Sequence, residues 1–427
     1  MKRDVLKELQ EFLVESPGCF HAVAALKRRL DAAGFTELSE TERWSLKPGK
    51  GYYVIRSGSS IISFKLPKGK PEGFHIIASH SDSPSFKLKP DPAMWSDGLL
   101  RLNVEGYGGM IRHTWFDRPL SVAGRVLVED GDKLVHKLVY FDRDLVMIPS
   151  LAIHLDRDKH EGPIKIQSEL LPLLGATDAD AWKKLLAEAA GTKIEKILGT
   201  DLFLTCRMAP SVWGAQNEFL SAPRLDDLAC AYGSFAGFLD ATPKGSIALH
   251  CVFDNEEVGS RSMQGAESTF LKTTAQRICR GLGMDEEGFD TAIASSFMVS
   301  ADNAHALHPN YAGKYDPVNR PKMNAGIVLK HHAGQKYMTD AISEAVFKKL
   351  CKKSGVPFQE YANNSDVPGG STLGNISNTQ LSIRGVDIGL AQLAMHSTYE
   401  TMGAADAGYL AQFASAFYGG KLPAVEN

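Results

Sequence analysis

The chain has 427 residues, of which 44% are hydrophobic and 23% are charged, as in a globular protein with a sizeable core. The net charge of −3 argues against a protein that coats nucleic acid or an anionic membrane. The sequence has no apolar run of the ~20 residues that span a bilayer and no Cys-x-x-Cys pair. We therefore expect a cytoplasmic protein with neither nucleic acid nor membrane as a partner.

The first predicted elements are two helices. The first carries an apolar stripe from Leu6 to Leu13 and ends at Ser16-Pro17-Gly18, and the second spans residues 20–33 and stops at Gly34. Apolar, strand-like segments then follow at residues 52–55, 61–64 and 74–78.

The pattern changes between residues 93 and 215. Two apolar segments, 126–128 and 134–135, flank an Asp-Gly turn and predict a β-hairpin. One helix interrupts this part, with Asp178 as the expected N-cap and Gly191 at its end. We therefore expect a mostly-β module here.

Apolar strands alternate with helices again after residue 215. The strands are expected at residues 247–253, 297–300, 327–329 and 388–391, with helices at 340–352 and 408–418. Such alternation is typical of an α/β sheet covered by helices on both faces. We predict an α/β domain made of residues 1–92 plus 216–427, split by an inserted β-rich domain at 93–215.

Possible metal ligands follow several of these strands. Taken singly, a His-x-Asp pair is more often a surface pair, and consecutive glutamates usually mark a solvated turn. What favours a site is that the pattern recurs at strand ends that one sheet could bring together. The segments are 79–82, 254–257, 302–305 and 395–396, and the loop at 223–227 adds two carboxylates.

Two histidines with several carboxylates form a mixed ligand set suited to zinc, manganese or cobalt. Two ions ~3.5–4 Å apart need one bridging carboxylate and separate terminal ligands. This chain can supply both and still leave one glutamate as a general base. The pair Glu256-Glu257 fits that division, because adjacent side chains point in different directions.

At these residues the sequence resembles the aspartyl aminopeptidase family of dinuclear zinc exopeptidases, over nearly the whole chain. The matching motifs are His80-Ser81-Asp82-Ser83-Pro84, Thr114–Arg118, Leu151–Arg157, Arg224–Asp227, Asp254–Ser260, Ser300–His305 and Gln392–Ser397. The resemblance implies a zinc-exopeptidase-like mixed sheet flanked by helices, and two divalent ions per subunit, with zinc expected first and manganese or cobalt as alternatives.

The resemblance also implies a role for each site residue. Asp226 would bridge the metals, Glu256 would be the catalytic base, and Asp82 would orient a histidine ligand through its distal nitrogen. A cis peptide is implied between Asp226 and Asp227. The implied terminal metal ligands are His80, Glu257, Asp302 and His396.

His154 lies in the inserted module, far along the chain from the other ligands. It could be a third histidine ligand, or a buried structural residue. We favour a third interpretation, in which it contacts substrate from a neighbouring subunit. Related enzymes form a tetrahedral dodecamer with the inserted module at subunit contacts, so we expect a large homo-oligomer, a dodecamer by resemblance.

Lys330 follows the predicted strand at 327–329, and its spacing from Asp302 matches the family's substrate-pocket lysine. A surface lysine closing a strand is the simpler interpretation. A lysine in the pocket would attract an acidic side chain at the first residue of a peptide. With His305 on the intervening loop, Lys330 predicts a preference for N-terminal Asp or Glu.

The sequence thus predicts a metalloaminopeptidase that acts on peptides. Alternatives are a binuclear N-acyl amino acid deacylase, an aminopeptidase of broad or neutral specificity, and a non-catalytic scaffold. The scaffold alternative is disfavoured because every expected metal ligand is present in the sequence. Three departures from the family pattern bear on specificity: Asp227 in place of Asn, Thr398-Tyr399 in place of Ile-Arg, and no cysteine at 366–373.

Overall fold

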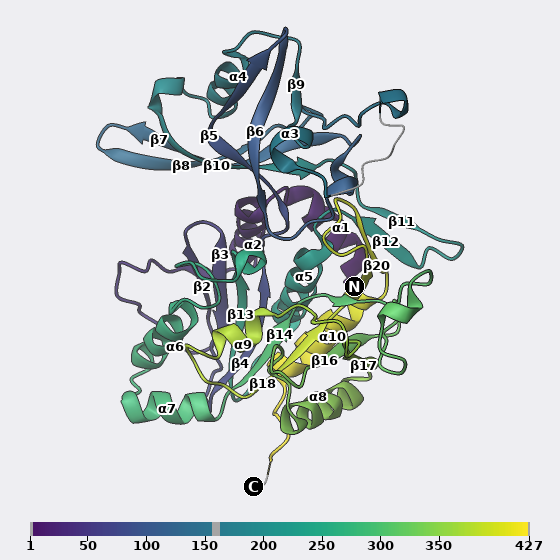
Figure 1. The fold of residues 1–427 in the computed structure, drawn as a ribbon. Helices are drawn as coiled ribbons and strands as arrows, with labels where there is room; N and C mark the ends of the chain where they lie inside the picture. Colours follow the sequence, from purple (N-terminus) through teal and green to yellow (C-terminus); the bar gives the residue numbers. More distant parts are fainter. Residues whose placement is uncertain (1–2, 156–162, 426–427) are drawn as a thin grey trace.

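The computed structural model describes residues 3–155 and 163–425. A nine-stranded mixed sheet forms the larger body of the molecule, with the inserted strands above it (Figure 1). Its strands, in spatial order, are β1 (Thr36–Glu37), β2 (Gly51–Arg56), β3 (Ser60–Lys65), β13 (Ile247–Phe253), β4 (Phe74–His80), β14 (Phe297–Ala301), β18 (Gly385–Gly389), β16 (Ile327–His331) and β17 (Phe358–Ala362). The central strands β13, β4, β14 and β18 are parallel neighbours.

Helices cover both faces of this sheet. One face packs against α1 (Val5–Glu15), α2 (Cys19–Ala32), α5 (Leu225–Asp240), α8 (Ala341–Ser354) and α10 (Asp406–Gly419), and the other against α6 (Phe270–Gly281), α7 (Glu286–Ala294) and α9 (Leu373–Ser377). Successive β4 side chains enter opposite cores, because Ile77 packs with the first helix set and Ile76 with the second. The expected α/β fold with helices on both faces is confirmed.

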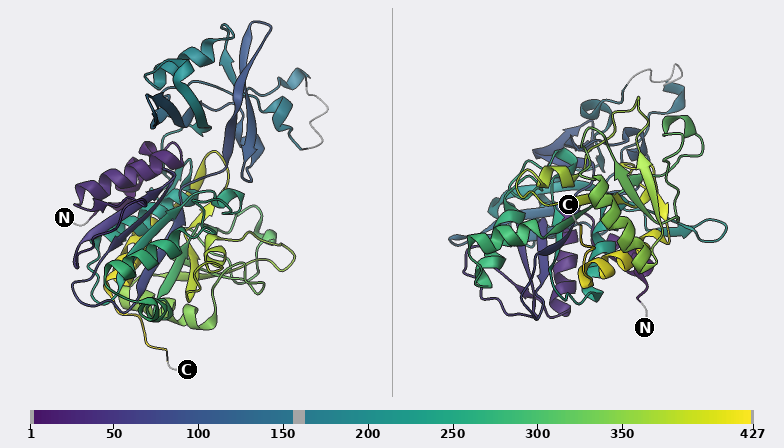
Figure 2. Two further views of the ribbon diagram at one scale, coloured as in Figure 1. Left: turned by 90° about the vertical axis from the view of Figure 1, so that its left-hand side faces the viewer. Right: turned by 90° about the horizontal axis from the view of Figure 1, so that it is seen from below.

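A six-stranded antiparallel sheet has a hydrophobic core of its own, which includes Phe86 and Trp115. It stands above the nine-stranded sheet both in Figure 1 and in the left view of Figure 2. Its strands, in order, are β8 (Lys133–Tyr140), β7 (Leu120–Asp130), β10 (Ile197–Cys206), β5 (Ser85–Ser96), β6 (Leu99–Tyr107) and β9 (Leu173–Gly175), with helices α3 (Ile166–Glu169) and α4 (Ala181–Ala189). The division of the chain at residues 93 and 215 stays a prediction.

Two expectations about local structure need correction. The N-cap of α4 is Asp180, and Asp178 instead accepts a hydrogen bond from the Asp180 amide. The strand expected at 388–391 is two strands in different sheets, because β18 ends at Gly389 and β19 begins at Ala391. A Cβ at Gly389 would lie 2.1 Å from the Asp302 carbonyl oxygen, so the crossing requires glycine.

Strand β19 belongs to a separate five-stranded sheet. Its strands, in order, are β11 (Ser211–Trp213), β12 (Phe219–Ala222), β20 (Glu400–Gly403), β19 (Ala391–Leu393) and β15 (Ala304–His305). Short 3₁₀ turns are η1 (Arg112–Trp115), η2 (Ile153–Leu155), η3 (Ile194–Lys196), η4 (Glu256–Val258) and η5 (Ala312–Lys314). Within the described residues, no helix combines the length and apolar character needed to cross a bilayer.

Candidate active site

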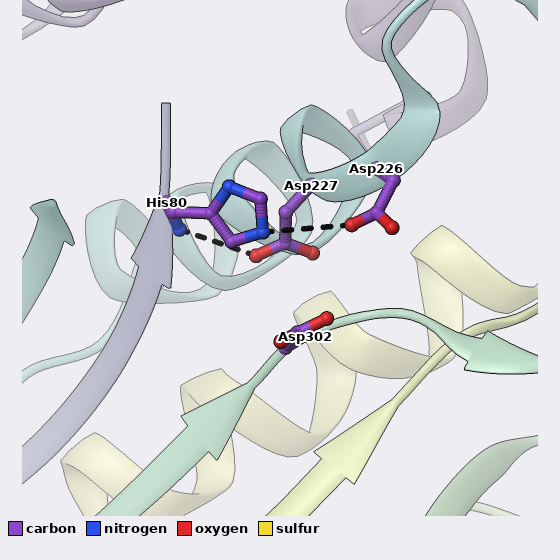
Figure 3. Close-up of side chains that lie close together, drawn as sticks. All are labelled: His80, Asp226, Asp227 and Asp302. Carbon is purple, nitrogen blue, oxygen red and sulfur yellow. Dashed lines mark hydrogen bonds and ion pairs between the residues drawn. The ribbon is translucent and has the colours of Figure 1, made fainter. Parts of the chain in front are cut away.

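The carboxyl ends of neighbouring strands bring the expected site residues together. His80 is the last residue of β4, Asp302 follows β14, and Glu256 begins the η4 turn after β13. Because β13, β4 and β14 run parallel in adjacent positions, these ends share one edge of the sheet. Asp226 reaches the same place from the first turn of α5 (Figure 3).

The Asp226 carboxylate lies between two imidazole rings. Its Oδ1 is 3.5 Å from His80 Nε2, and its Oδ2 is 3.5 Å from His396 Nε2. His396 Nε2 is also 3.4 Å from Glu257 Oε2. One carboxylate with a different histidine at each oxygen is the arrangement that a bridging ligand requires.

Within the described chain, three groups of potential ligand atoms converge at this edge, each with its atoms within 4.8 Å of one another. They are His80–Asp226–Asp227–Asp302, His80–Glu256–Glu257 and Asp226–Glu257–His396. Figure 3 shows the first group, with the Asp302 carboxylate facing His80 and the two α5 aspartates. The peptide bond between Asp226 and Asp227 is cis, as the resemblance implies.

Buried carboxylate oxygens at the cluster lack hydrogen-bond partners in the described structure. They are Asp226 Oδ1, Asp227 Oδ1 and Glu257 Oε1. Unpaired buried oxygens are costly unless a cation balances them. Imidazole nitrogens mixed with carboxylate oxygens suit zinc, and none of the three groups found among the described residues includes a cysteine. The residues present therefore fit a divalent metal centre.

The pKa values of the cluster reflect crowded, buried carboxylates. Burial, reinforced by the Asp302 carboxylate, raises the pKa of Glu256 to about 8. Burial and the adjacent charge of Asp226 raise the pKa of Glu257 well above its usual range. Burial lowers the pKa of His396, but its contact with Asp226 outweighs this and raises the value to about 9. A bound cation would reverse these shifts, because it favours ionised carboxylates and neutral imidazoles.

The distal nitrogens of both histidines have acceptors. His80 Nδ1 lies 3.1 Å from the Asp82 carbonyl oxygen and 3.5 Å from Asp82 Oδ1. His396 Nδ1 lies in hydrogen-bond contact with the Gly109 carbonyl oxygen, in the loop after β6. These contacts leave the Nε2 atoms facing the cluster, as metal-binding histidines require.

Asp82 also fixes the turn that carries both glutamates. Its carboxylate accepts hydrogen bonds from the amides of Glu256 (3.1 Å) and Glu257 (3.2 Å) and from the hydroxyl of Tyr107 (2.6 Å). Sequence reasoning identified Asp82 but missed Tyr107 and Gly109. No sequence signal marks them, because one is the last residue of a strand and the other contributes only a carbonyl.

Lys330 and His305 line the same cavity of about 190 Å³ as the metal-binding candidates. Lys330 is 3% exposed, donates to the Asn303 carbonyl oxygen at 2.8 Å and lies 3.7 Å from Asp302 Oδ1. The surface interpretation of this lysine is therefore wrong. The cavity is lined by His80, Asp226, Glu256, Asp302, Asn303, Ala304, His305, Lys330, Tyr337, Tyr361, Gly370, Ser371, Thr372, Met395 and His396.

His154 lies outside this cavity. It is an exposed residue of η2, between the exposed side chains of Ile153 and Leu155. It belongs to none of the candidate metal groups found among the described residues. The motif to which it belongs continues into residues 156–157, which lie outside the described residues.

Two of the departures from the family pattern have defined contacts. Asp227 Oδ2 accepts a hydrogen bond from the His80 amide at 3.2 Å. The Tyr399 hydroxyl donates to the Ala209 carbonyl oxygen at 2.7 Å, and Tyr399 does not line the cavity among the described residues.

Comparison with known proteins identifies the family. Residues 12–418 match the model for the aminopeptidase I zinc metalloproteases, M18. The probable M18 family aminopeptidase 2 of Clostridium novyi is 42% identical over 423 residues, covering 96% of this chain and 98% of that protein. These matches confirm the family to which the resemblance pointed, and they do not favour the deacylase alternative.

Solved structures agree with this assignment. A cryo-EM structure of the Ape4 and Nbr1 complex aligns with a TM-score of 0.93 at 36% identity, covering 97% of this chain and 85% of that one. The S. cerevisiae mApe1 dodecamer aligns with a TM-score of 0.84 at 26% identity, covering 97% and 96%. The chain therefore belongs to the M18 family and is a metallo-aminopeptidase, a hydrolase.

Proposed function

We propose that this aminopeptidase removes N-terminal Asp or Glu from peptides at a centre of two divalent ions, with zinc as the expected metal. The observation that carries the proposal is the position of Lys330. It lines the same cavity as His80, Asp226 and His396, which are the proposed metal ligands. The remaining proposed ligands are Glu257 and Asp302.

Divalent ions at this cluster would polarise the scissile carbonyl group and acidify water. Glu256 is the proposed general base. Its carboxylate lines the cavity, and the adjacent Glu257 is the proposed ligand. Glu256 accepts a proton from the attacking water and passes it to the leaving amine. The Asp82 carboxylate accepts hydrogen bonds from the amides of both glutamates and so holds the turn that carries them.

Lys330 supplies the proposed selectivity for acidic residues. Lys330 is buried. Burial alone would lower its pKa, whereas the nearby Asp302 carboxylate raises it. The contact with Asp302 outweighs burial and raises the pKa of Lys330, so the ammonium group stays charged at neutral pH. A buried charge attracts a carboxylate more strongly than an exposed one. His305, on the same cavity wall, is a second proposed substrate contact.

We also propose that the chain works as a homo-oligomer, expected to be a dodecamer, in which His154 contacts substrate in the site of a neighbouring subunit. The dodecameric S. cerevisiae relative supports this proposal. So does the apolar surface beside His154, where Leu151, Ile153 and Leu155 are 54%, 68% and 74% exposed. The inserted domain, residues 93–215, would then lie at subunit contacts. A cytoplasmic location is part of the same proposal.

A substrate panel tests the proposed specificity. The protein is stripped of metal, reloaded with Zn²⁺, Mn²⁺ or Co²⁺, and assayed on aminoacyl anilides of Asp, Glu, Ala, Leu and Lys. We expect the acidic substrates to have the highest kcat/KM, and N-acetylated Asp to be inert. Fast cleavage of the Leu substrate with no cleavage of the Asp substrate would contradict the acidic pocket.

A further inference from the structure

A second cavity of about 300 Å³ lies between the N-terminal helices, the catalytic loops and the six-stranded sheet. Among the described residues, it shares no lining residue with the cavity of the metal cluster. It is bounded instead by the residues that follow along the same loops, Ser81 and Asp82 after His80 and Ser397 after His396. Its volume exceeds the roughly 150 Å³ of a cavity that holds benzene, so it can hold a small organic molecule.

Arg224 lines this cavity, and among the described residues its guanidinium forms no ion pair with a carboxylate within 4.0 Å. Its guanidinium donates to the carbonyl oxygens of Ser16 (2.9 Å) and Leu13 (3.3 Å) and to the hydroxyl of Thr205 (2.8 Å). All these acceptors are neutral. Within the described residues, no carboxylate oxygen lies within 4.0 Å of it. Burial lowers the pKa of Arg224, which reflects the cost of desolvating that charge.

Further donors line the same cavity. Trp115 is 3% exposed, and its indole Nε1 has no hydrogen-bond partner in the described structure. The fourteen-residue helix α2 begins at the cavity wall, with Gly18 as an N-cap that offers no side-chain acceptor. The positive end of its dipole therefore adds to the charge of Arg224.

The carboxylates that line this cavity already have donors. Asp201 is paired with Lys87 at 2.8 Å and with Arg125 at 2.9 Å. Asp82 is held by the Tyr107 hydroxyl and by backbone amides. Glu400 accepts hydrogen bonds from the amides of Asp226 and His396, and Asp254 from the amide of Asn255. Among the described residues, the Arg224 guanidinium forms no such ion pair, and Glu400 favours its positive charge only from beyond 4.0 Å.

The remaining walls are largely apolar. They include Pro17, Phe20, Pro84, Phe203, Leu204 and Pro223. We propose that this cavity is a second binding site, for a small organic carboxylate whose acid group pairs with Arg224 and whose apolar body packs on these rings. The site is independent of the proposed peptidase specificity.

Gly18 offers a way to fill the cavity without straining the backbone. Its φ of −170° and ψ of 173° are extended, and a Cβ built there meets no atom within 4 Å. Gly18→Phe should place a ring in the cavity, whereas Gly18→Ala leaves most of the space open. Gly18 is no part of the metal cluster, so both variants should keep the peptidase activity of the unaltered enzyme.

The test is calorimetric titration of the metal-loaded enzyme with 3-phenylpropionate and with its neutral isostere 3-phenylpropionamide. We expect the acid to bind at least tenfold more tightly than the amide. Gly18→Phe should weaken the binding of the acid at least tenfold, Gly18→Ala less than threefold, and Arg224→Met should remove the preference for the acid. Equal affinity for acid and amide, no binding of either, or binding that Gly18→Phe leaves unchanged would overturn the proposal. The last result would place the acid at the metal cluster.

Discussion

The hydroxyl of Tyr107 lies 2.6 Å from Asp82 Oδ2 and joins the six-stranded sheet to a loop of the candidate metal site. Tyr107 is the last residue of β6, and its oxygen also accepts a hydrogen bond from Asn255 Nδ2 at 2.8 Å. Asp82 in turn holds the amide of Glu256. The proposed general base is thus connected to the six-stranded sheet through two side chains.

Tyr107→Phe removes this connection while keeping the aromatic ring. A hydrogen bond to a charged group contributes about 1.5–3 kcal/mol, so we expect kcat to fall about tenfold or more, with a smaller change in KM. Steady-state kinetics and zinc titration measure the effect. Tyr232→Phe is the control, because it also removes a hydroxyl that donates to a carboxylate, Glu8, which belongs to none of the candidate metal groups among the described residues. Equal losses in both variants would mean that Tyr107 acts only through stability.

The stability of the metal-free protein should fall between pH 6.5 and 8. In the folded state the pKa values of Glu256 and Glu400 are raised to about 8 by burial, and that of His396 to about 9 by Asp226. The unfolded chain has already released these protons in this window, so the folded state binds more protons. Stability then decreases as pH rises, by about 1.4 kcal/mol per pH unit for each proton of difference.

Buried histidines titrate in the opposite sense, but only below this window. Burial lowers the pKa to about 4 for His21, His75 and His250. Their contribution to the free energy of unfolding therefore changes only between pH 4 and 6.5. Urea unfolding in a chelator, compared with unfolding in excess zinc, measures the effect. Bound zinc should make the free energy of unfolding depend less on pH, because it ionises the carboxylates. A metal-free protein that gains stability toward pH 8 would contradict the raised pKa values of these groups.

Lys330→Met should lower kcat/KM for Asp and Glu substrates at least tenfold more than for Leu. The substitution removes the charge proposed to pair with the substrate carboxylate and roughly conserves the length of the side chain. Lys349→Met, at an exposed position of α8, is the control. An equal loss on acidic and neutral substrates would mean that Lys330 acts by holding Asp302, from which it lies 3.7 Å.

Mixed oligomers test the proposed role of His154. Glu256→Gln and His154→Phe subunits are each expected to be nearly inactive alone. If His154 serves the site of a neighbouring subunit, co-assembled oligomers regain activity, because some sites combine an intact Glu256 with an intact His154. Light scattering checks the assembly. A monomeric mass, or mixtures no more active than the separate variants, would contradict the proposal.

The sequence predicted the parts of the site that depend on strand position. His80, Glu256 and Asp302 follow apolar strands, and parallel pairing of β4, β13 and β14 brings such ends together. The hydrophobic core on each face of the sheet could also be predicted, because continuous apolar strands need helices to cover both faces.

Other parts depend on contacts between distant segments and carry no sequence signal. The carbonyl of Gly109 reaches His396 across 287 positions of the chain. The crossing from β18 to β19 is set by the close approach of Gly389 to the Asp302 backbone, which an apolar pattern cannot reveal. The exposed position of His154 differs from the buried structural alternative, and its proposed contact with a neighbouring subunit stays a prediction.

The most direct test of the catalytic centre measures kcat and bound zinc together in Glu256→Gln and Glu257→Gln. If Glu256 moves the proton and Glu257 binds metal, Glu256→Gln lowers kcat by ~10²–10⁴ with unchanged zinc content, and Glu257→Gln loses zinc as well. A Glu256→Gln enzyme that keeps most of its activity, or that loses its zinc, would contradict this account.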